Sequence, residues 1–303
     1  MEAKWLEDFL SVARTGNFSQ SAAERHITQS AFSRRIKALE QWVGVALIDR
    51  SSYPTRLTSA GEKFHDVVKE VTSSLLKTRQ DLRQVLNADH KLLRIAVQHS
   101  LAGGFLARWL ATLPLQRDAT LVRVKADNLH DCIRELEEGN VDVLICYAHA
   151  ELPLGLDKER YPSFLMAEDT LVAFTNPAAD GRPLHSLRPE AARQVPWLAY
   201  NAETFLGRAA ALAHGKGPLP VALHAVFQSA LAEALRAAAV AGLGVAWLPV
   251  SLVNDDVDRG SLVRAGDSDF DLPLQVRLYG DRLSLTGHLR TLLAGVCNID
   301  ELS

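Results

Sequence analysis

Hydrogen-bonding and cationic side chains recur along one stretch of the chain at the spacing of a single helical face. Opposite its apolar residues, this stretch presents Gln29, Ser30, Ser33, Arg34 and Lys37. Amide, hydroxyl and guanidinium groups can hydrogen-bond to base edges, and the two cations can neutralise phosphates. The face could therefore recognise nucleic acid; a merely solvated helix surface is the alternative.

Three short helices would position this face. A first amphipathic helix ends at Gly16, and a second begins near Ser19 as its N-cap. Thr28 can cap a third helix, residues 29–43, whose buried stripe is formed by Phe32, Ile36, Leu39 and Val43. Two short helices joined by a tight turn, the second polar on its outer side, are typical of a helix-turn-helix.

The segment after the third helix strengthens this interpretation. Residues 44–48 predict a turn into a short strand, and residues 50–58 a hairpin-like segment of the kind that forms a DNA-flanking wing. Residues 28–58 carry five basic and two acidic side chains. The local excess of positive charge favours DNA binding over a small helical bundle with a solvated face.

Four segments carry a family resemblance: Asn17–Ala23, Thr28–Glu40, Leu47–Arg50 and Leu57–Gly61. In this order they resemble the N-terminal signature of LysR-type transcriptional regulators. Ser30 stands where the family usually has proline, and Ile48-Asp49 replaces its usual Phe-x, but neither change removes a base-reading side chain. The resemblance implies an all-α winged helix-turn-helix domain, residues 1–58, that reads a partly palindromic promoter site in double-stranded DNA as a dimer or tetramer.

The resemblance also implies roles for individual side chains. It places Gln29, Ser33, Arg34 and Lys37 toward the major groove, and Arg50 and Arg56 at the wing and its phosphate contacts. The full expected DNA-binding set is Ser19, Gln20, Thr28, Gln29, Ser30, Ser33, Arg34, Lys37, Arg50 and Arg56. Because phosphate neutralisation would supply much of the affinity, we expect it to depend steeply on salt.

Residues 59–88 are predicted to form one long linker helix. Ser59 and Glu62 have the spacing of a capping box. After this cap, a row of mostly apolar residues is spaced alternately four and three positions apart, as in the seam of a coiled coil. The seam comprises Phe64, Val68, Val71, Leu75, Thr78, Leu82 and Val85. Such a helix is about 42 Å long, and its seam favours pairing with a second copy. Packing on the chain's own domain is the alternative.

From residue 89 strands alternate with helices, which predicts a parallel α/β sheet. We expect strands near 92–97, 120–125, 141–147, 171–174, 195–200, 221–227, 244–248 and 272–279, and helices near 101–113, 129–138, 204–213, 229–241 and 286–296. The alternation fits one large sheet or two lobes. The resemblance implies an effector-binding domain, residues 89–303, of two lobes folded like periplasmic binding proteins. Lobe I would span about 89–167 and 266–303 and lobe II about 168–265, with crossing strands near Glu168 and Ala265.

Ligands of open α/β sheets bind at the carboxyl ends of strands, beside helix N-termini whose free amides favour anions. Three such strand–helix junctions occur, and the resemblance places them around the cleft between the lobes. The expected effector-binding residues are His99, Ser100, Leu101, Tyr200, Asn201, Thr204, Gln228 and Ser229. Each has an alternative role as a helix cap or turn former.

The net charge of −3 averages two unlike parts. Residues 1–86 carry thirteen Lys and Arg against ten Asp and Glu, whereas the remainder carries twenty against twenty-six. The three cysteines lie too far apart in the sequence for a disulfide framework or a zinc site. We expect Cys132 and Cys146 to be inert packed thiols. No metal or cofactor is expected. No signal peptide opens the chain, and charges interrupt the apolar stretch 229–250, so we expect a cytoplasmic protein with no membrane partner.

Catalysis is not expected of this chain. His99, Asp127, His130, Asp142 and Cys146 are of the types that active sites use, but they form no nucleophile–base or metal-ligand spacing. The glycines of residues 242–249 follow a helix and precede a strand, the reverse of the order in a dinucleotide-binding motif.

Two other functions stay open beside a promoter-binding regulator modulated by a small-molecule effector. One is an oxidant-responsive regulator without a cleft ligand. Residues 4–6 and 99–101 resemble the hypochlorite-responsive branch of the family, described as sensing through methionine oxidation, yet Met1 and Met166 are the chain's two methionines. The other is a solute-binding module that never contacts DNA, which would leave the basic face unexplained.

Overall fold

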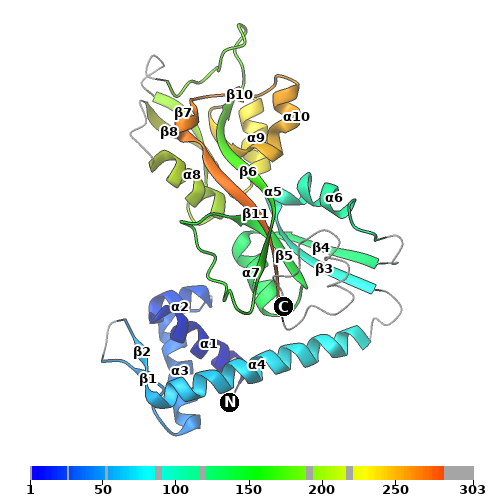
Figure 1. The fold of residues 1–303 in the computed structure, drawn as a ribbon. Helices are drawn as coiled ribbons and strands as arrows, with labels where there is room; N and C mark the ends of the chain where they lie inside the picture. Colours follow the sequence, from blue (N-terminus) through cyan, green and yellow to red (C-terminus); the bar gives the residue numbers. More distant parts are fainter. Residues whose placement is uncertain are drawn as a thin grey trace. The chain divides into compact units, whose positions relative to one another are not determined.

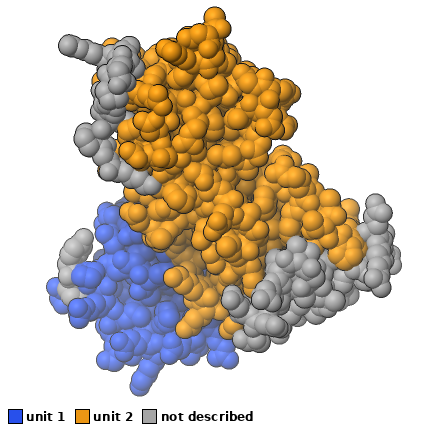
Figure 2. Space-filling view, turned by 45° about the horizontal axis from the view of Figure 1, so that its top comes forward, with its two compact units in different colours: residues 1–86 blue, residues 87–303 orange. Residues whose placement is uncertain are grey.

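The computed structural model describes residues 2–25, 27–51, 54–85, 91–115, 120–188, 194–215 and 221–282. The chain forms two compact units, residues 1–86 and residues 87–303 (Figure 2). The helix expected near residues 286–296 lies outside the described part of the chain.

The first unit combines helices with a two-stranded ribbon, as the sequence predicts. Its elements are α1 (Ala3–Thr15), α2 (Phe18–Glu24), α3 (Gln29–Val43), β1 (Ile48–Asp49), β2 (Arg56–Leu57) and α4 (Ser59–Val85) (Figure 1). The strands pair antiparallel, with Ile48 opposite Leu57 and Asp49 opposite Arg56. This is a winged helix-turn-helix followed by one long helix.

Two of the three expected helix caps are displaced. Asn17, not Ser19, caps α2, because its side chain accepts hydrogen bonds from the amides of Ser19 and Gln20 at 2.9 and 3.1 Å. Thr58, not Ser59, caps α4, and its hydroxyl accepts from the amide of Gly61 at 3.0 Å. The cap expected at Thr28 is confirmed.

The core of the first unit forms beneath α3. Phe32, Ile36 and Leu39 are fully buried, and they pack with Phe9 of α1 and Leu47 of the wing. The buried stripe predicted from their spacing is confirmed. It turns the opposite side of α3 toward solvent.

One apolar face of α4 changes its surroundings along the helix. Near its start Val68 is buried and Phe64 packs against Phe9, with ring centroids 5.5 Å apart, so both residues belong to the core of their own unit. Further along, apolar side chains of the same face are exposed, at Val71, Leu75 and Leu82. The first part of the predicted seam therefore packs on its own domain, and the exposed part begins at Val71.

The second unit alternates strands and helices. Its elements are β3 (Lys91–Gln98), α5 (His99–Ala102), α6 (Phe105–Leu110), β4 (Thr120–Asp127), α7 (Leu129–Glu137), β5 (Val143–Ala148), β6 (Ser163–Thr175), β7 (Gln194–Tyr200), α8 (Phe205–Gly215), β8 (Ala222–Ser229), α9 (Ala232–Val240), β9 (Ala246–Pro249), α10 (Val250–Asp258), β10 (Val263–Arg264), the 3-10 turn η1 (Ser268–Phe270) and β11 (Leu272–Gly280). The single helix expected at 101–113 is wrong, because Gly103 and Gly104 separate α5 from α6.

Two long strands connect the two lobes of this unit. One sheet has the order β10-β6-β11-β5-β3-β4, with β9 also paired to β6, and β7 pairs with β8 in a second sheet. In Figure 1, β6 and β11 run side by side from one lobe into the other. Glu168 lies on β6 as expected, opposite Gln275 of β11. The second crossing was expected near Ala265; in the structure Ala265 follows the two-residue strand β10, and the second long connecting strand is β11, which begins at Leu272 after η1.

Within the described residues, no helix is long and apolar enough to span a membrane, and no cluster of three potential metal ligands occurs.

Candidate functional site

The outer face of α3 is open to solvent. Gln29, Ser30, Arg34 and Lys37 are exposed and Ser33 is half-buried. The Nε group of Arg34 donates to the carbonyl oxygen of Ser30 at 3.4 Å, and the side chain is exposed. The structure therefore gathers on one surface the five side chains singled out on this helix.

Neighbouring arginines are held by carboxylates instead. Arg35 of α3 turns inward to Asp8 at 3.2 Å, and Arg25 contacts both Asp8 at 2.9 Å and Glu7 at 2.5 Å. Asp8 is fully buried. In α3, among the described residues, Arg34 and Lys37 are the cations without an ion-pair partner, so the positive charge available to a ligand is concentrated on the outer face.

The wing is fastened to α3 by Glu40. Its Oε1 accepts from the amides of Leu47 and Ile48 at 3.0 and 3.2 Å, and its Oε2 accepts from the guanidinium of Arg50 at 2.9 Å. Arg50 also lies over the ring of Phe18, 5.4 Å from its centroid. Arg50 is thus held beside α2 and α3.

The other predicted DNA-binding residues surround this face. Ser19 and Gln20 are exposed at the start of α2, and Thr28 is exposed at the start of α3, where its hydroxyl lies 3.2 Å from that of Ser30. Arg56 is exposed on β2, opposite Asp49. All ten lie at the surface of the first unit, at least in part.

The second unit has buried polar groups at the strand–helix junctions. Ser100, two residues after the end of β3, is nine-tenths buried, and its Oγ has no hydrogen-bond partner among the described residues. It lies on α5, which contacts α9 of the other lobe. Leu101 is fully buried in the core, and His99 is partly exposed, with Nε2 3.9 Å from Asp127.

The junction after β7 has a similar group. Tyr200 is 5% exposed, and its hydroxyl also lacks a partner among the described residues. Burial raises the pKa of Tyr200, and the Glu233 carboxylate raises it further. No side chain caps α9 at Leu231. Ser100 on α5 and Tyr200 at the end of β7 thus belong to two elements that both contact α9.

The remaining predicted effector residues have local structural roles. The Thr204 hydroxyl donates to the Asn201 carbonyl at 2.8 Å and accepts from the amide of Gly207 at 3.0 Å, which caps α8. Ser229 accepts from the amide of Leu231 at 3.0 Å. Gln228 is exposed on β8.

A hydrogen-bonded cluster that the sequence analysis missed joins the lobes. Tyr147 of β5 donates to Asp169 of β6 at 2.9 Å, and Ser251 of α10 donates to the same carboxylate oxygen at 2.5 Å. Burial and then the Asp169 carboxylate raise the pKa of Tyr147 well above its ordinary value, and Tyr200 contributes in the same direction.

Comparison with known proteins identifies both units. Residues 3–62 match the model described as "Bacterial regulatory helix-turn-helix protein, lysR family", and residues 87–295 match "LysR substrate binding domain". The chain belongs to the LysR family of transcriptional regulators. Like the family, this LysR-type chain joins a DNA-binding helix-turn-helix to an effector-binding domain of two lobes.

Individual relatives resemble this LysR-type regulator along nearly its whole length. The transcriptional regulator YjiE of Escherichia coli is 29% identical over 282 residues, which cover 92% of this chain and 88% of YjiE. The structure of Vibrio fischeri DarR in complex with DNA is 28% identical, covers 99% of both chains and has a TM-score of 0.60. Full-length HypT of Salmonella typhimurium, a hypochlorite-specific LysR-type regulator, is 27% identical over 97% of both chains, with a TM-score of 0.60.

The two described cysteines of this LysR-type chain are protonated at neutral pH. Burial raises the pKa of Cys132 to about 12 and that of Cys146 further still. The Cys132 thiol donates to the carbonyl of Val97 at 3.4 Å. Since the thiolate is the reactive species, both behave as packing residues in the folded protein. Met166 is half-buried on β6.

Proposed function

We propose that α3 and the wing form the contact of this regulator with double-stranded promoter DNA. The observation that carries the proposal is the pair of unpaired cations, Arg34 and Lys37, beside Gln29 and Ser33 on one exposed face. Arginine and lysine pair with guanine in the major groove, and glutamine pairs with adenine. Arg50 and Arg56 contribute phosphate contacts from the wing.

The starts of α2 and α3 extend this surface. Ser19, Gln20, Thr28 and Ser30 carry hydroxyl or amide groups at helix N-termini, where backbone amides and the helix dipole favour phosphate oxygens. These four residues fix the orientation of the domain on DNA, and the α3 face supplies the sequence preference.

The exposed part of the α4 face pairs with a second copy of the chain. Val71, Leu75 and Leu82 are exposed at coiled-coil spacing beyond the domain that buries Phe64 and Val68. An isolated helix gains stability by burying such a face against another helix. The regulator therefore acts as a homodimer, or as a tetramer built from such dimers, in the cytoplasm and without catalytic activity of its own.

A small molecule between α5 and α9 modulates DNA binding. Buried hydroxyls normally have hydrogen-bond partners, so the unpaired groups of Ser100 and Tyr200 favour a ligand with polar atoms there. Such a ligand touches both lobes, and it acts by favouring one arrangement of the regulator over another.

DNase I protection tests the DNA-binding proposal. The full chain should protect a discrete site in the DNA upstream of its own gene, and an unrelated duplex of equal length should compete poorly. Equal competition by the unrelated duplex would show that the α3 face does not read sequence.

A thermal-shift screen tests the effector site. The full chain is heated with small anionic, aromatic and amino-acid metabolites, and each stabilising compound is retested on Ser100→Ala and Tyr200→Phe. Both variants should lose the shift, whereas Tyr161→Phe should keep it, since its hydroxyl is equally buried and unpaired but lies beside Arg160. A shift that survives both substitutions would place the effector elsewhere.

A further inference from the structure

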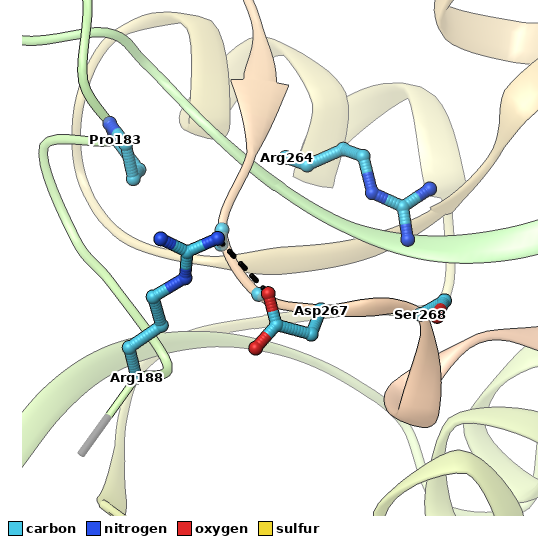
Figure 3. Close-up of a pocket in the computed structure, with 7 residues that line it drawn as sticks. Pro183, Arg188, Arg264, Asp267 and Ser268 are labelled. Atoms are coloured by element: carbon cyan, nitrogen blue, oxygen red, sulfur yellow. Dashed lines mark hydrogen bonds and ion pairs between the residues drawn. The ribbon is translucent and has the colours of Figure 1, made fainter.

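A hollow of about 380 Å³ lies in lobe II, away from the effector site. It is bounded by the loop that reaches Arg188 and by the turn from Arg264 to Ser268 (Figure 3). None of the eight residues predicted to bind the effector lines it. A hollow of this volume is within the range that holds small ligands.

The floor of the hollow is held by buried backbone. The amide of Leu187 donates to the carbonyl of Ala265 at 2.7 Å, and the amide of Ala265 donates to Ala173 of β6 at 2.9 Å. Leu187 and Ala265 are almost fully buried. A side chain at Gly266 would bring a Cβ within 3.1 Å of Leu187, so the turn fits closely against the loop. The turn that lines the hollow is therefore closely packed on the loop that precedes Arg188.

Opposite charges face each other in this hollow. Figure 3 shows Arg188 and Asp267 pointing toward one another, and Nη2 of Arg188 lies 3.0 Å from Oδ1 of Asp267. Both side chains are 62% exposed. An ion pair so exposed contributes little to stability, and a ligand can therefore separate its two partners at small cost.

The neighbouring arginine of the hollow is already neutralised. Nη2 of Arg264 donates to both carboxylate oxygens of Asp271, at 2.8 and 2.7 Å. Arg188 instead makes one hydrogen bond to Asp267, from Nη2 to Oδ1. Most of the five N–H donors of its guanidinium are not used by that contact. The interaction that a ligand can replace is therefore the ion pair between Arg188 and Asp267.

We propose that this hollow binds a small zwitterion with a carboxylate and an ammonium group close together, as in a free α-amino acid. The carboxylate accepts two parallel hydrogen bonds from Arg188, and the ammonium donates to Asp267. A lone anion on Arg188 would lie beside the released carboxylate of Asp267, and a lone cation would leave Arg188 unpaired. A zwitterion gives each partner a new opposite charge and leaves the net charge of the site unchanged.

Binding to the full chain is measured by saturation-transfer NMR and calorimetry. The amino-acid probes are L-alanine, L-leucine, L-glutamine and L-arginine. Propionate is alanine without its ammonium group, and ethylamine is alanine without its carboxylate. At least one amino acid should bind, and at equal concentration propionate and ethylamine should not. If no amino acid binds, or if propionate binds as tightly as alanine, the proposal is wrong.

Substitutions locate the site. Arg188→Gln and Asp267→Asn should each weaken amino-acid binding at least tenfold. Arg182→Gln is the matched control, because Arg182 belongs to another exposed pair, with Asp180 at 3.7 Å, and does not line the hollow. Unchanged binding to Arg188→Gln would overturn the proposal. Loss of binding in Ser100→Ala or Tyr200→Phe would also overturn it, since the amino acid would then occupy the region between α5 and α9.

Discussion

The carboxylate of Glu40, on the third helix, accepts a hydrogen bond from the guanidinium of Arg50 at 2.9 Å while its other oxygen accepts two amides of the wing strand. One side chain of α3 thus binds both the backbone at the start of the wing and the guanidinium of Arg50. Arg50 in turn covers Phe18 of α2. If the wing contacts DNA as proposed, Glu40 would influence that contact without touching DNA.

Glu40→Gln should weaken promoter binding about tenfold, because the amide keeps one acceptor for the wing but loses the charge that holds Arg50. Fluorescence anisotropy with promoter DNA measures the affinity. Glu62→Gln is the control, since Glu62 is an exposed glutamate of α4, and it should bind normally. Equal affinities for the Glu40→Gln variant and the unmodified chain would show that Glu40 does not position the wing.

Gly61→Ala should destabilise the first unit by about 2 kcal/mol. A Cβ at this position would collide with the carbonyl oxygen of Leu47, where α4 packs on the wing backbone. Gly103→Ala has nothing within 4 Å of its new Cβ and should be neutral or slightly stabilising. Urea unfolding followed by circular dichroism compares the two, and an equally small effect of both would contradict the close approach.

Leu75→Asp combined with Leu82→Asp should convert the assembled regulator to smaller species. Both leucines are exposed on the α4 face, and aspartates there would be buried without partners in a helix pair. Light scattering after gel filtration gives the mass. Glu70→Lys changes charge on another face of α4 and should leave the mass unchanged. An unaltered mass in the double aspartate variant would exclude this face from the interface.

The second unit should lose stability as the pH falls from about 6.5 to about 4. The ring of His214 packs between Trp197 and Trp247, at centroid distances of 5.1 and 4.1 Å, and burial lowers its pKa from 6.5 to about 4. Across that interval the unfolded chain binds a proton that the folded chain does not, so folding weakens by up to about 3 kcal/mol.

His214→Phe should remove this acid dependence and leave stability at pH 7 nearly unchanged. Thermal unfolding at pH 7, 6 and 5 measures it. His224→Phe is the control, because His224 is exposed and should leave the acid dependence intact. If unmodified protein and His214→Phe lose stability in parallel, His214 is not the titrating group.

Periodicity in the sequence predicted the elements that carry a repeated apolar pattern. The spacing of Phe32, Ile36 and Leu39 predicted both faces of α3. In a regular helix, polar side chains that do not lie on the buried apolar stripe lie on the opposite, solvent-facing side. The pattern did not distinguish neighbouring helix caps, because the side chains of Asn17, Ser19, Thr58 and Ser59 can all accept a hydrogen bond from a backbone amide. The backbone conformation at the start of each helix determines which of these side chains caps it.

The local sequence pattern could not predict contacts between residues that are far apart in the sequence. Arg34 and Arg35 are adjacent and chemically equal, yet Arg35 pairs with Asp8, 27 residues away, and Arg34 does not. The strand of β11 was predicted close to its observed range, but the pattern did not show that this strand, and not the chain near Ala265, crosses between the lobes, because the two-residue strand β10 precedes it. The cluster of Tyr147, Asp169 and Ser251 joins three elements far apart in sequence, and no spacing indicates it.

The affinity of Arg34→Ala for promoter and for unrelated DNA tests the central claim most directly. Arg14→Ala is the matched control, because Arg14 is an exposed arginine of the same unit that is paired with Glu24 at 2.8 Å. Arg34→Ala should lose about 1–3 kcal/mol of promoter binding and most of its preference over unrelated DNA, while Arg14→Ala keeps both. Unchanged affinity and preference in Arg34→Ala, or an equal loss in Arg14→Ala, would contradict the assignment of the α3 face to base recognition.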